Sequence, residues 1–493
     1  MTLFLLGILI LIAGYFFYGK LVENILQPDD RETPAVRLRD GVDFMVLPHW
    51  KNMLIQLLNI AGIGPVIGVI LGIKFGVIVF VIIPVGNIIG GAVHDFLAGM
   101  MSLRGNGANL PKLIGENIGR RFYYAFSGFM VLLLLLVVAV FINIPAQLSG
   151  KLLSGTALGT LLPGNGLFWA AVAVIFLYYV LATLFPIDKI IGSLYPVFGG
   201  MLLLGTLLIF IAMCCKLPGA PELLSETPAF REGMFTAEKG QPLIPMLFVT
   251  IACGILSGFH ATQSPIIART MKSERQARSS FYGMMVAEGL IAMVWAGAGL
   301  MIYNLFPELM TKVPGGVLAD ITNHFLGSKA GMITVLSVIV LAVTSGDTAM
   351  RSLRLSLAEI FRIPQEKVLN RILLCLPLTA VIALLLWWSN RDAASFNHLW
   401  NYFAWGNQVL AACTLAAGAV WLWKQGKNGL IAWIPGAFIT FVVLTYILWI
   451  SPAHKGPFGF GLELDHACIL AGAGVLMITL FLLEKVRNAG KGE

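Results

Sequence analysis

The sequence has 493 residues, of which 58% are hydrophobic and only 12% are charged, and its formal net charge is +8. These proportions exclude a soluble globular protein and indicate a polytopic protein of the lipid bilayer, because apolar runs long enough to cross roughly 30 Å of hydrocarbon recur throughout. The positive charge requires no nucleic-acid partner, because cytoplasmic loops of such proteins are rich in Lys and Arg.

The apolar runs predict an all-α fold with thirteen membrane spans. Residues 1–19 lack a basic leading segment and a clear cleavage site, so they predict a retained helix rather than a signal peptide. The predicted spans are 2–19, 54–73, 75–94, 122–143, 167–185, 193–214, 245–263, 281–305, 330–346, 371–388, 402–423, 430–450 and 467–484.

The distribution of basic residues predicts the orientation. Most of the 33 Lys and Arg residues fall on one side of the membrane if the loop 20–51 is cytoplasmic, as the positive-inside rule requires. The N-terminus is then outside and the C-terminus is in the cytoplasm, which agrees with an odd number of spans.

The second predicted span is interrupted near its middle. Ala61-Gly-Ile-Gly-Pro65 separates two apolar halves, which predicts either a packing kink or a broken helix near 62–65. Backbone groups released from helical hydrogen bonds survive in a membrane only inside protein or beside a water-filled cavity.

Three ionisable residues lie in or next to apolar spans. His94 is the last residue of the third span and Asp95 follows it, where they cap the helix, pair with Arg104 or relay protons. Glu288 lies about two helical turns inside the eighth span. A carboxyl group at that depth is costly and is therefore a functional candidate, unless it reaches the surface or pairs with an Arg of the preceding loop.

The seventh span, 245–263, runs into a polar stretch around Ser257 and Pro265. The helix either ends there at a polar loop or breaks over 257–265 within the membrane. This second interruption lies five spans after the first, so the two helices run in opposite directions. Paired broken helices in corresponding positions predict a binding site between inverted repeats.

The ninth span ends in oxygen-bearing side chains that suit a cation. One carboxylate among hydroxyls fits either a monovalent ion such as Na⁺, held by Ser345, Asp347 and Thr348, or a proton. The alternative is a polar helix end in which Asp347 pairs with Arg351 at i+4.

These patterns divide the chain into two five-helix repeats with flanking helices. The predicted parts are residues 1–50 (one helix and a cytoplasmic loop), 51–215 (first repeat), 216–244 (an extracytoplasmic loop), 245–424 (second, inverted repeat) and 425–493 (two further helices).

Four motifs resemble the carbon starvation protein A (CstA) family of bacterial inner-membrane transporters. They are Val93-His-Asp-Phe-Leu-Ala-Gly-Met, Leu103-Arg-Gly-Asn-Gly-Ala-Asn-Leu-Pro, Gly254-Ile-Leu-Ser-Gly-Phe-His-Ala-Thr-Gln-Ser-Pro and Thr344-Ser-Gly-Asp-Thr-Ala. The resemblance covers about 45–425 and implies a secondary carrier for a small carboxylate such as pyruvate, or for peptides. It also implies the 5+5 inverted-repeat fold of LeuT/APC-like transporters, whose first and sixth core helices are unwound at the substrate. Longer relatives carry further C-terminal helices.

A carrier driven by a proton or sodium gradient is therefore the predicted function. The alternatives are a channel or a membrane sensor of the same metabolites, but no filter signature is visible and no output domain follows Lys485. The absence of an HExxH motif or a paired catalytic set argues against an enzyme. The six cysteines lack metal-type spacing, so no cofactor is expected beyond a coupling Na⁺ or H⁺.

The expected substrate site lies between the two breaks, where backbone N–H groups and a half-helix end suit an anion. Its predicted residues are Gly62, Gly64, Ser257, Gly258, His260, Thr262, Gln263 and Ser264. The expected coupling site combines Thr344, Ser345, Asp347 and Thr348 with the carbonyls of Ile60 and Ala61, and its further candidates are Glu288, His94 and Asp95. Asp347→Asn is expected to abolish gradient-driven uptake.

Overall fold

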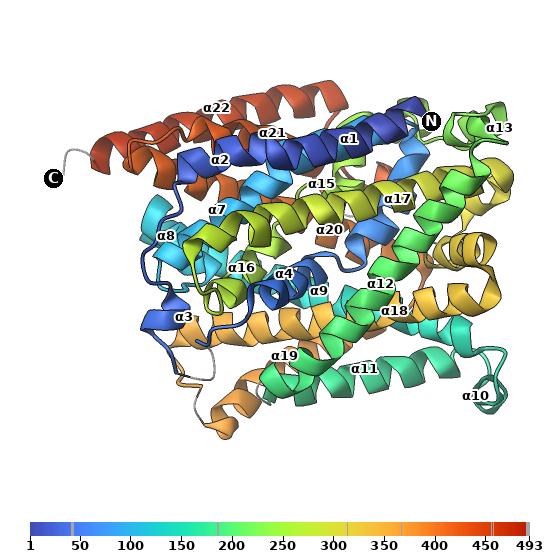
Figure 1. The fold of residues 1–493 in the computed structure, drawn as a ribbon, viewed down its shortest axis with the longest axis horizontal. Helices are drawn as coiled ribbons and strands as arrows, with labels where there is room; N and C mark the ends of the chain where they lie inside the picture. Colours follow the sequence, from blue (N-terminus) through green and yellow to red (C-terminus); the bar gives the residue numbers. More distant parts are fainter. Residues whose placement is uncertain are drawn as a thin grey trace.

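The computed structural model describes residues 1–40, 44–184, 187–312, 314–365, 367–454, 456 and 458–489. In these parts of the chain the secondary structure is helical, apart from an isolated β-bridge between Glu32 and Ser273. Most of the long helices run roughly along one direction, while the short helices α4 (His49–Ile60) and α16 (Phe259–Ala268) end in the middle of the molecule (Figure 1).

The helices that belong to the other candidate membrane spans surround or flank these two. They are α1 (Thr2–Phe16), α2 (Tyr18–Leu26), α6 (Val79–Gly86), α7 (Ala92–Arg104), α9 (Arg120–Leu153), α11 (Gly166–Leu184), α12 (Ile187–Lys216), α17 (Met284–Leu305), α18 (Pro314–Phe361), α19 (Val368–Ser389), α20 (Ala393–Lys424), α21 (Leu430–Trp449) and α22 (Leu464–Ala489). The other α-helices are α3 (Pro34–Arg37), α5 (Val69–Gly72), α8 (Leu110–Ile118), α10 (Ala157–Leu161), α13 (Pro228–Gly233), α14 (Phe248–Thr250) and α15 (Ala252–Ile255).

Among the described residues, eleven helices are long and apolar enough to cross a membrane, and the number is twelve when one bent helix pair is counted as a single span. These match twelve of the predicted spans. The one predicted span without such a match is the seventh, 245–263, which consists of short helical pieces from η6 (Leu243–Leu247) to α16. A multi-pass helical membrane protein is confirmed, and the count of thirteen crossings stays a prediction.

The predicted break in the second span is present. Helix α4 ends at Ile60, and the helical chain resumes with the π-helix η1 (Gly64–Gly68). The two segments are bent by 52° relative to one another. A Cβ atom at Gly64 would lie 2.2 Å from the Cβ of Cys253. Glycine is therefore required here because η1 packs directly against α15.

The break in the seventh span is shorter than predicted. Leu256 is extended, with φ −168° and ψ 108°, and the helix resumes at Phe259. The predicted interruption over 257–265 was therefore wrong at its C-terminal side, because α16 continues through Pro265 to Ala268. The two broken segments contact one another, whereas the two-fold relation between the predicted repeats stays a prediction.

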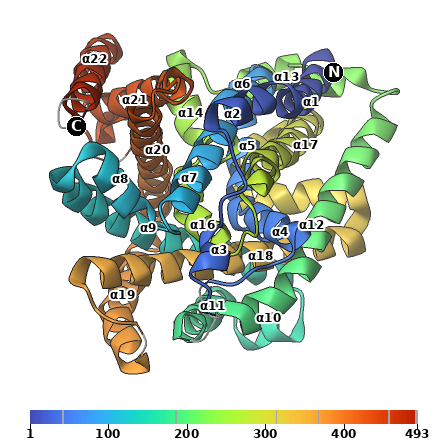
Figure 2. The same ribbon diagram turned by 60° about the vertical axis from the view of Figure 1, so that its left-hand side comes forward.

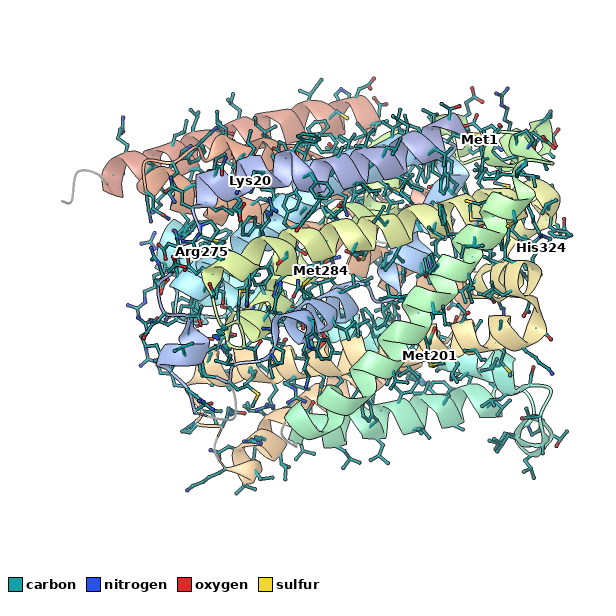
Figure 3. All side chains as sticks on the ribbon, viewed as in Figure 1. Met1, Lys20, Met201, Arg275, Met284 and His324 are labelled. Atoms are coloured by element: carbon teal, nitrogen blue, oxygen red, sulfur yellow. The ribbon has the colours of Figure 1, made fainter. Side chains whose placement is uncertain are left out.

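Segments that are predicted to lie on the same side of the membrane are found at the same end of the molecule. Lys20 and Arg275 lie at one end, which we call the basic side, while Met1 and His324 lie at the opposite end (Figure 3). The rotated view places one end of α22 near α8, which also belongs to the basic side (Figure 2). This agrees with the predicted alternation, and the assignment of the basic side to the cytoplasm stays a prediction.

Candidate functional site

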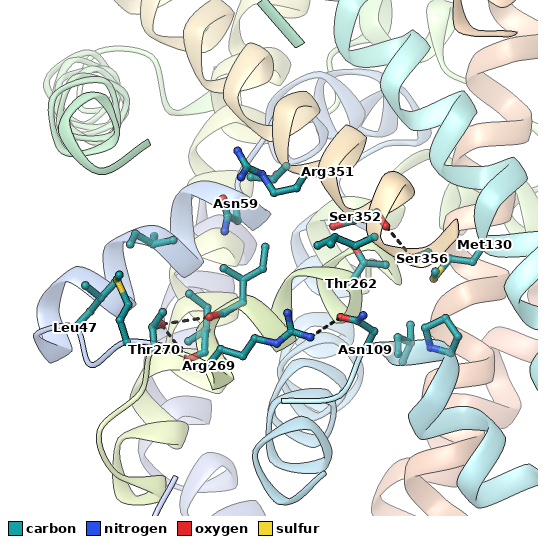
Figure 4. A pocket seen from close by; sticks show the side chains of 18 of the residues that line it. Leu47, Asn59, Asn109, Met130, Thr262, Arg269, Thr270, Arg351, Ser352 and Ser356 are labelled. Carbon is teal, nitrogen blue, oxygen red and sulfur yellow. Dashed lines mark hydrogen bonds between the residues drawn. The ribbon is translucent and has the colours of Figure 1, made fainter. Parts of the chain in front are cut away.

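A cavity of about 130 Å³ opens between α4, α16 and α18. Figure 4 shows Arg351 and Arg269 on opposite sides of it, with Thr262 between them. The polar lining residues are Lys51, Asn59, Asn109, Thr262, Arg269, Thr270, Thr348, Arg351, Ser352 and Ser356, and the remaining lining is apolar. Two guanidinium groups and a row of hydroxyl and amide groups give the cavity the chemistry of an anion site.

The two arginines are held in different ways. Arg351 is only 4% exposed, donates through Nη2 to the carbonyl of Ala182 at 3.1 Å, and lies 3.9 Å from a carboxylate oxygen of Asp347. Arg269 donates to the carbonyl of Gly107 at 2.9 Å and to Asn109 Oδ1 at 3.1 Å. Each guanidinium is therefore oriented by the protein while it lines the cavity.

The beginning of α16 is bound by Asn407 of α20. The backbone N–H of Phe259 donates to Asn407 Oδ1 at 2.7 Å, and Asn407 Nδ2 donates to Ser257 Oγ at 2.9 Å. The N–H of Gly258 donates to the carbonyl of Asn407 at 3.2 Å. Backbone donors at this break thus bind protein groups, as buried donors must.

Of the predicted substrate residues, Thr262 lines the cavity. Gly62 lies against Phe141, and Gly64 lies against Cys253. The remaining predicted residues form hydrogen bonds within the protein around α16, namely Ser257, Gly258, His260, Gln263 and Ser264. The structure therefore shifts the cavity from the breaks themselves toward the basic side.

The predicted coupling residues of α18 point in different directions. Ser345 Oγ donates to the carbonyl of Leu58 on α4 at 3.4 Å, and Thr348 lines the cavity. Asp347 lies beside Tyr178 of α11 and Arg351, while the carbonyl of Ile60 accepts from the N–H of Gly62. Thr344 Oγ1 donates to the carbonyl of Leu341 on its own helix at 2.9 Å, and a common cation site formed by these residues and Ala61 stays a prediction.

A second cluster of ionisable groups lies on the other side of α16. His94 Nδ1 lies 2.8 Å from Asp95 Oδ1, and His260 Nδ1 lies 3.1 Å from Asp95 Oδ2. His260 Nε2 in turn lies 3.7 Å from Glu288 Oε2. All four side chains are at most 1% exposed. We call these four residues the His–carboxylate cluster.

The structure contradicts several of the roles that the sequence left open for these residues. His94 and Asp95 do not end their helix, because the helical segment continues to Arg104. Arg104 pairs with Glu274 at 3.1 Å rather than with Asp95. Glu288 is fully buried next to His260, so it neither reaches the surface nor pairs with an Arg of the preceding loop.

The chain between α2 and α4, which we call the N-terminal loop, is attached to the basic-side end of α16. The N–H groups of Met45 and Leu47 donate to the carbonyls of Arg269 and Thr270 at 3.2 and 3.0 Å. Thr33 Oγ1 donates to the carbonyl of Met271 at 2.6 Å. Met45 and Leu47 also line the cavity, so this loop forms part of the cavity wall.

The family model described as carbon starvation protein CstA matches residues 1–160, 148–323 and 310–446. The chain belongs to the CstA family. An uncharacterized membrane protein of Haemophilus influenzae is 40% identical over 353 residues, which cover 64% of this chain and 95% of that protein.

Relatives named as CstA peptide transporters are more distant. The protein of Campylobacter jejuni is 26% identical over 350 residues, 58% of this chain and 48% of that protein. The protein of Bacillus subtilis is 26% identical over 357 residues, 60% of this chain and 58% of that protein. The chain thus spans about half the length of these CstA relatives, whose names are those of transporters, not enzymes.

The fold is also found outside the CstA family. A crystal structure of the Eremococcus coleocola manganese transporter, in complex with an aromatic bis-isothiourea compound, aligns with a TM-score of 0.54 and 14% identity. The alignment covers 92% of this chain and 99% of that transporter. At this identity the likeness shows a shared transporter fold and nothing about the cargo.

Sequence reasoning missed several residues of this CstA-family site. It gave Arg351 only the role of a partner for Asp347, and it gave no site role to Asn407, Arg269 or Asn109. The signal for Arg351 was present, because a guanidinium seven residues after Thr344 continues the face of a membrane helix. Asn407 gave no such signal, since its role depends on the packing of α20 against α16.

Proposed function

We propose that this CstA-family protein is a secondary active transporter that takes up a small organic carboxylate across the bacterial inner membrane, its basic side facing the cytoplasm. The observation that carries the proposal is the cavity beside the broken helices, in which Arg351 faces hydroxyl groups. A guanidinium binds a carboxylate with two parallel hydrogen bonds, which a single ammonium cannot do.

The cavity supports a compact substrate over a long peptide. Its volume of about 130 Å³ is below the roughly 300–1,000 Å³ typical of sites for drug-sized ligands. Ser352 can donate a hydrogen bond to the rest of a small substrate. The hydroxyl of Thr348 donates to the carbonyl of Ser345, so its oxygen can accept one. The apolar residues around them can contact the carbon atoms of the substrate. A pyruvate-sized carboxylate therefore fits better than a peptide.

The proposal is tested by transport in proteoliposomes that contain the purified protein. We expect uptake of radiolabelled pyruvate to saturate, to be driven by an inward proton gradient, and to show counterflow. Labelled dipeptides under the same gradients provide the comparison suggested by the names of the relatives. Uptake that does not saturate would indicate a channel, and dipeptide uptake without pyruvate uptake would contradict the proposed substrate class.

Replacing Asp347 with Asn tests its part in this function. Asp347 lies 3.9 Å from Arg351, so the loss of its charge leaves the guanidinium more attractive to a substrate anion. We expect KM to fall roughly tenfold, which corresponds to about 1.4 kcal/mol, and maximal uptake to fall because release is slower. The amide of Asn has nearly the same volume as the carboxylate, so the substitution changes the charge while the packing around α18 is preserved.

The alternative for Asp347 is the coupling site expected from the sequence. In that case Asp347→Asn proteoliposomes would lose accumulation driven by the gradient and keep an unchanged affinity in exchange assays. Measuring KM for exchange and the accumulation ratio in the same vesicles separates the two roles.

A further inference from the structure

We propose that the His–carboxylate cluster is a binding site for one exchangeable proton, and that α16 transmits the occupancy of this site to the cavity. The coupling to substrate rests on the proposed transport function, whereas the proton site itself can be tested without any transport. His260 is the central residue, because it lies between Asp95 and Glu288.

The burial of the cluster favours proton binding. Two ionised carboxylates with two neutral imidazoles would place a charge of about −2 in a sealed site, and each buried ion costs several kcal/mol. Asp95 lies within hydrogen-bond distance of both His94 and His260, whereas neither oxygen of Glu288 has a hydrogen-bond partner among the described residues. A proton between Glu288 and His260 satisfies one of these oxygens and reduces the charge.

The geometry defines where the proton can move. With Nδ1 of His260 directed to Asp95, its Nε2 is the atom that faces Glu288, at 3.7 Å. A neutral Glu288 can donate its proton to Nε2, and a protonated His260 can return it, with no other bond made or broken. Closing the 3.7 Å separation to a hydrogen bond requires a shift of α16 or α17 of about 1 Å or less.

The oxygen and nitrogen atoms that the cluster offers as ligands favour a proton over a metal ion or Na⁺. Alkali and alkaline-earth cations prefer several oxygen ligands, whereas imidazole nitrogens account for half of this cluster. Within the described parts of the chain, no group of three or more His, Cys, Asp or Glu residues has an arrangement that could hold a metal ion.

The surrounding elements present other titratable groups. Cys253 of α15 and Tyr282 of η8 (Arg278–Gly283) are ordinarily neutral, and Tyr282 donates to the carbonyl of Ile88 at 3.2 Å. Several cations on the packed helices bind other groups. Arg104 binds Glu274, Arg278 and Lys20 bind Glu23, Lys424 binds the carbonyls of Glu116 and Asn117, and Arg351 binds the carbonyl of Ala182. The proton would therefore be exchanged within the four residues of the cluster.

Helix α16 connects the cluster to the cavity because its two faces serve different sites. His260 faces the cluster, whereas Thr262 and Ile266, one turn apart, line the cavity. The helix has only ten residues and begins at the break, after extended Leu256. A movement of His260 toward Glu288 would therefore turn Thr262 relative to Thr348 and Arg351 across the cavity.

The proton site is tested by infrared difference titration of the purified protein in H₂O and D₂O. We expect the wild type to show the C=O band of a protonated carboxyl group that shifts in D₂O and disappears as pH rises. Glu288→Gln should remove this band. The matched control is Glu274→Gln, which replaces a glutamate that is also buried, at 1% exposed, but is ion-paired with Arg104. This variant should keep the band.

Transport provides the second readout. In Glu288→Gln vesicles we expect a proton gradient to give no accumulation, a loss of at least roughly tenfold, while exchange of labelled substrate stays measurable. A band that persists in Glu288→Gln together with wild-type accumulation would overturn the inference. If the wild type titrates as expected but moves none of the tested carboxylates, the proposed function fails and the proton site stands.

Discussion

Replacing Arg351 with Gln is expected to lower Vmax/KM for carboxylate uptake roughly 100-fold. A charged hydrogen bond contributes about 1.5–3 kcal/mol, and a guanidinium can make two to one carboxylate. Arg351→Lys keeps the charge but loses this paired geometry, so we expect an intermediate loss of about tenfold. Initial rates of uptake in proteoliposomes over a range of substrate concentrations provide the measurement.

Arg354 offers a matched control on the same helix. Its side chain is 5% exposed and donates to Gln365, and it is not among the residues that line the cavity. Arg354→Gln therefore also removes a buried guanidinium from α18, and we expect its KM to stay within about threefold of the wild type. Equal losses in the two variants would mean that Arg351 stabilises α18 without binding substrate.

Replacing Gly258 with Ala is expected to abolish uptake and to lower the thermal stability of the purified protein. A Cβ atom at Gly258 would lie 2.4 Å from both the nitrogen of Ala411 and the carbonyl oxygen of Asn407. These are backbone atoms of α20, so a rotamer change cannot relieve the contact. Overpacking of this kind costs about 1–3 kcal/mol, and here it also separates α16 from the Asn407 side chain that caps it.

Gly128→Ala is the control for this substitution. No atom lies within 4 Å of a Cβ placed at Gly128, which is an exposed residue of α9. Alanine favours the helix over glycine by about 1 kcal/mol, so this variant should melt at or above the wild-type temperature and keep its uptake. Wild-type melting and uptake in Gly258→Ala would show that the α16–α20 contact has room to adjust.

The membrane spans and the existence of both helix breaks could be predicted from the sequence because these features depend on local composition. Apolar runs mark the spans, and glycine and proline in an apolar run mark a break. The ends of several helices were predicted too early, however. The third span was expected to end at His94, whereas the helical segment runs from Val79 to Arg104. The ninth span was expected to end at Gly346, whereas α18 continues to Phe361.

These errors have one physical cause. A hydropathy pattern treats each ionisable residue as a reason for a helix to leave the membrane, but Asp95 and Asp347 stay buried beside a basic partner. This partner is His260 of α16 for Asp95 and Arg351 of α18 for Asp347. The same tertiary contacts decide which side chains line the cavity. Thr262 and His260 are two residues apart in one motif, and only the packing of α16 between α4 and α7 assigns them to different sites.

The attachment of the N-terminal loop to the end of α16 suggests a place for a spectroscopic reporter. Glu32 is exposed and bridges to Ser273 through its backbone, so its side chain can be exchanged for a labelled cysteine without loss of the bridge. Because this loop is bound to the segment that follows α16, a fluorophore at position 32 should follow the motion of that helix. Its emission would then allow the transport cycle to be timed in single vesicles.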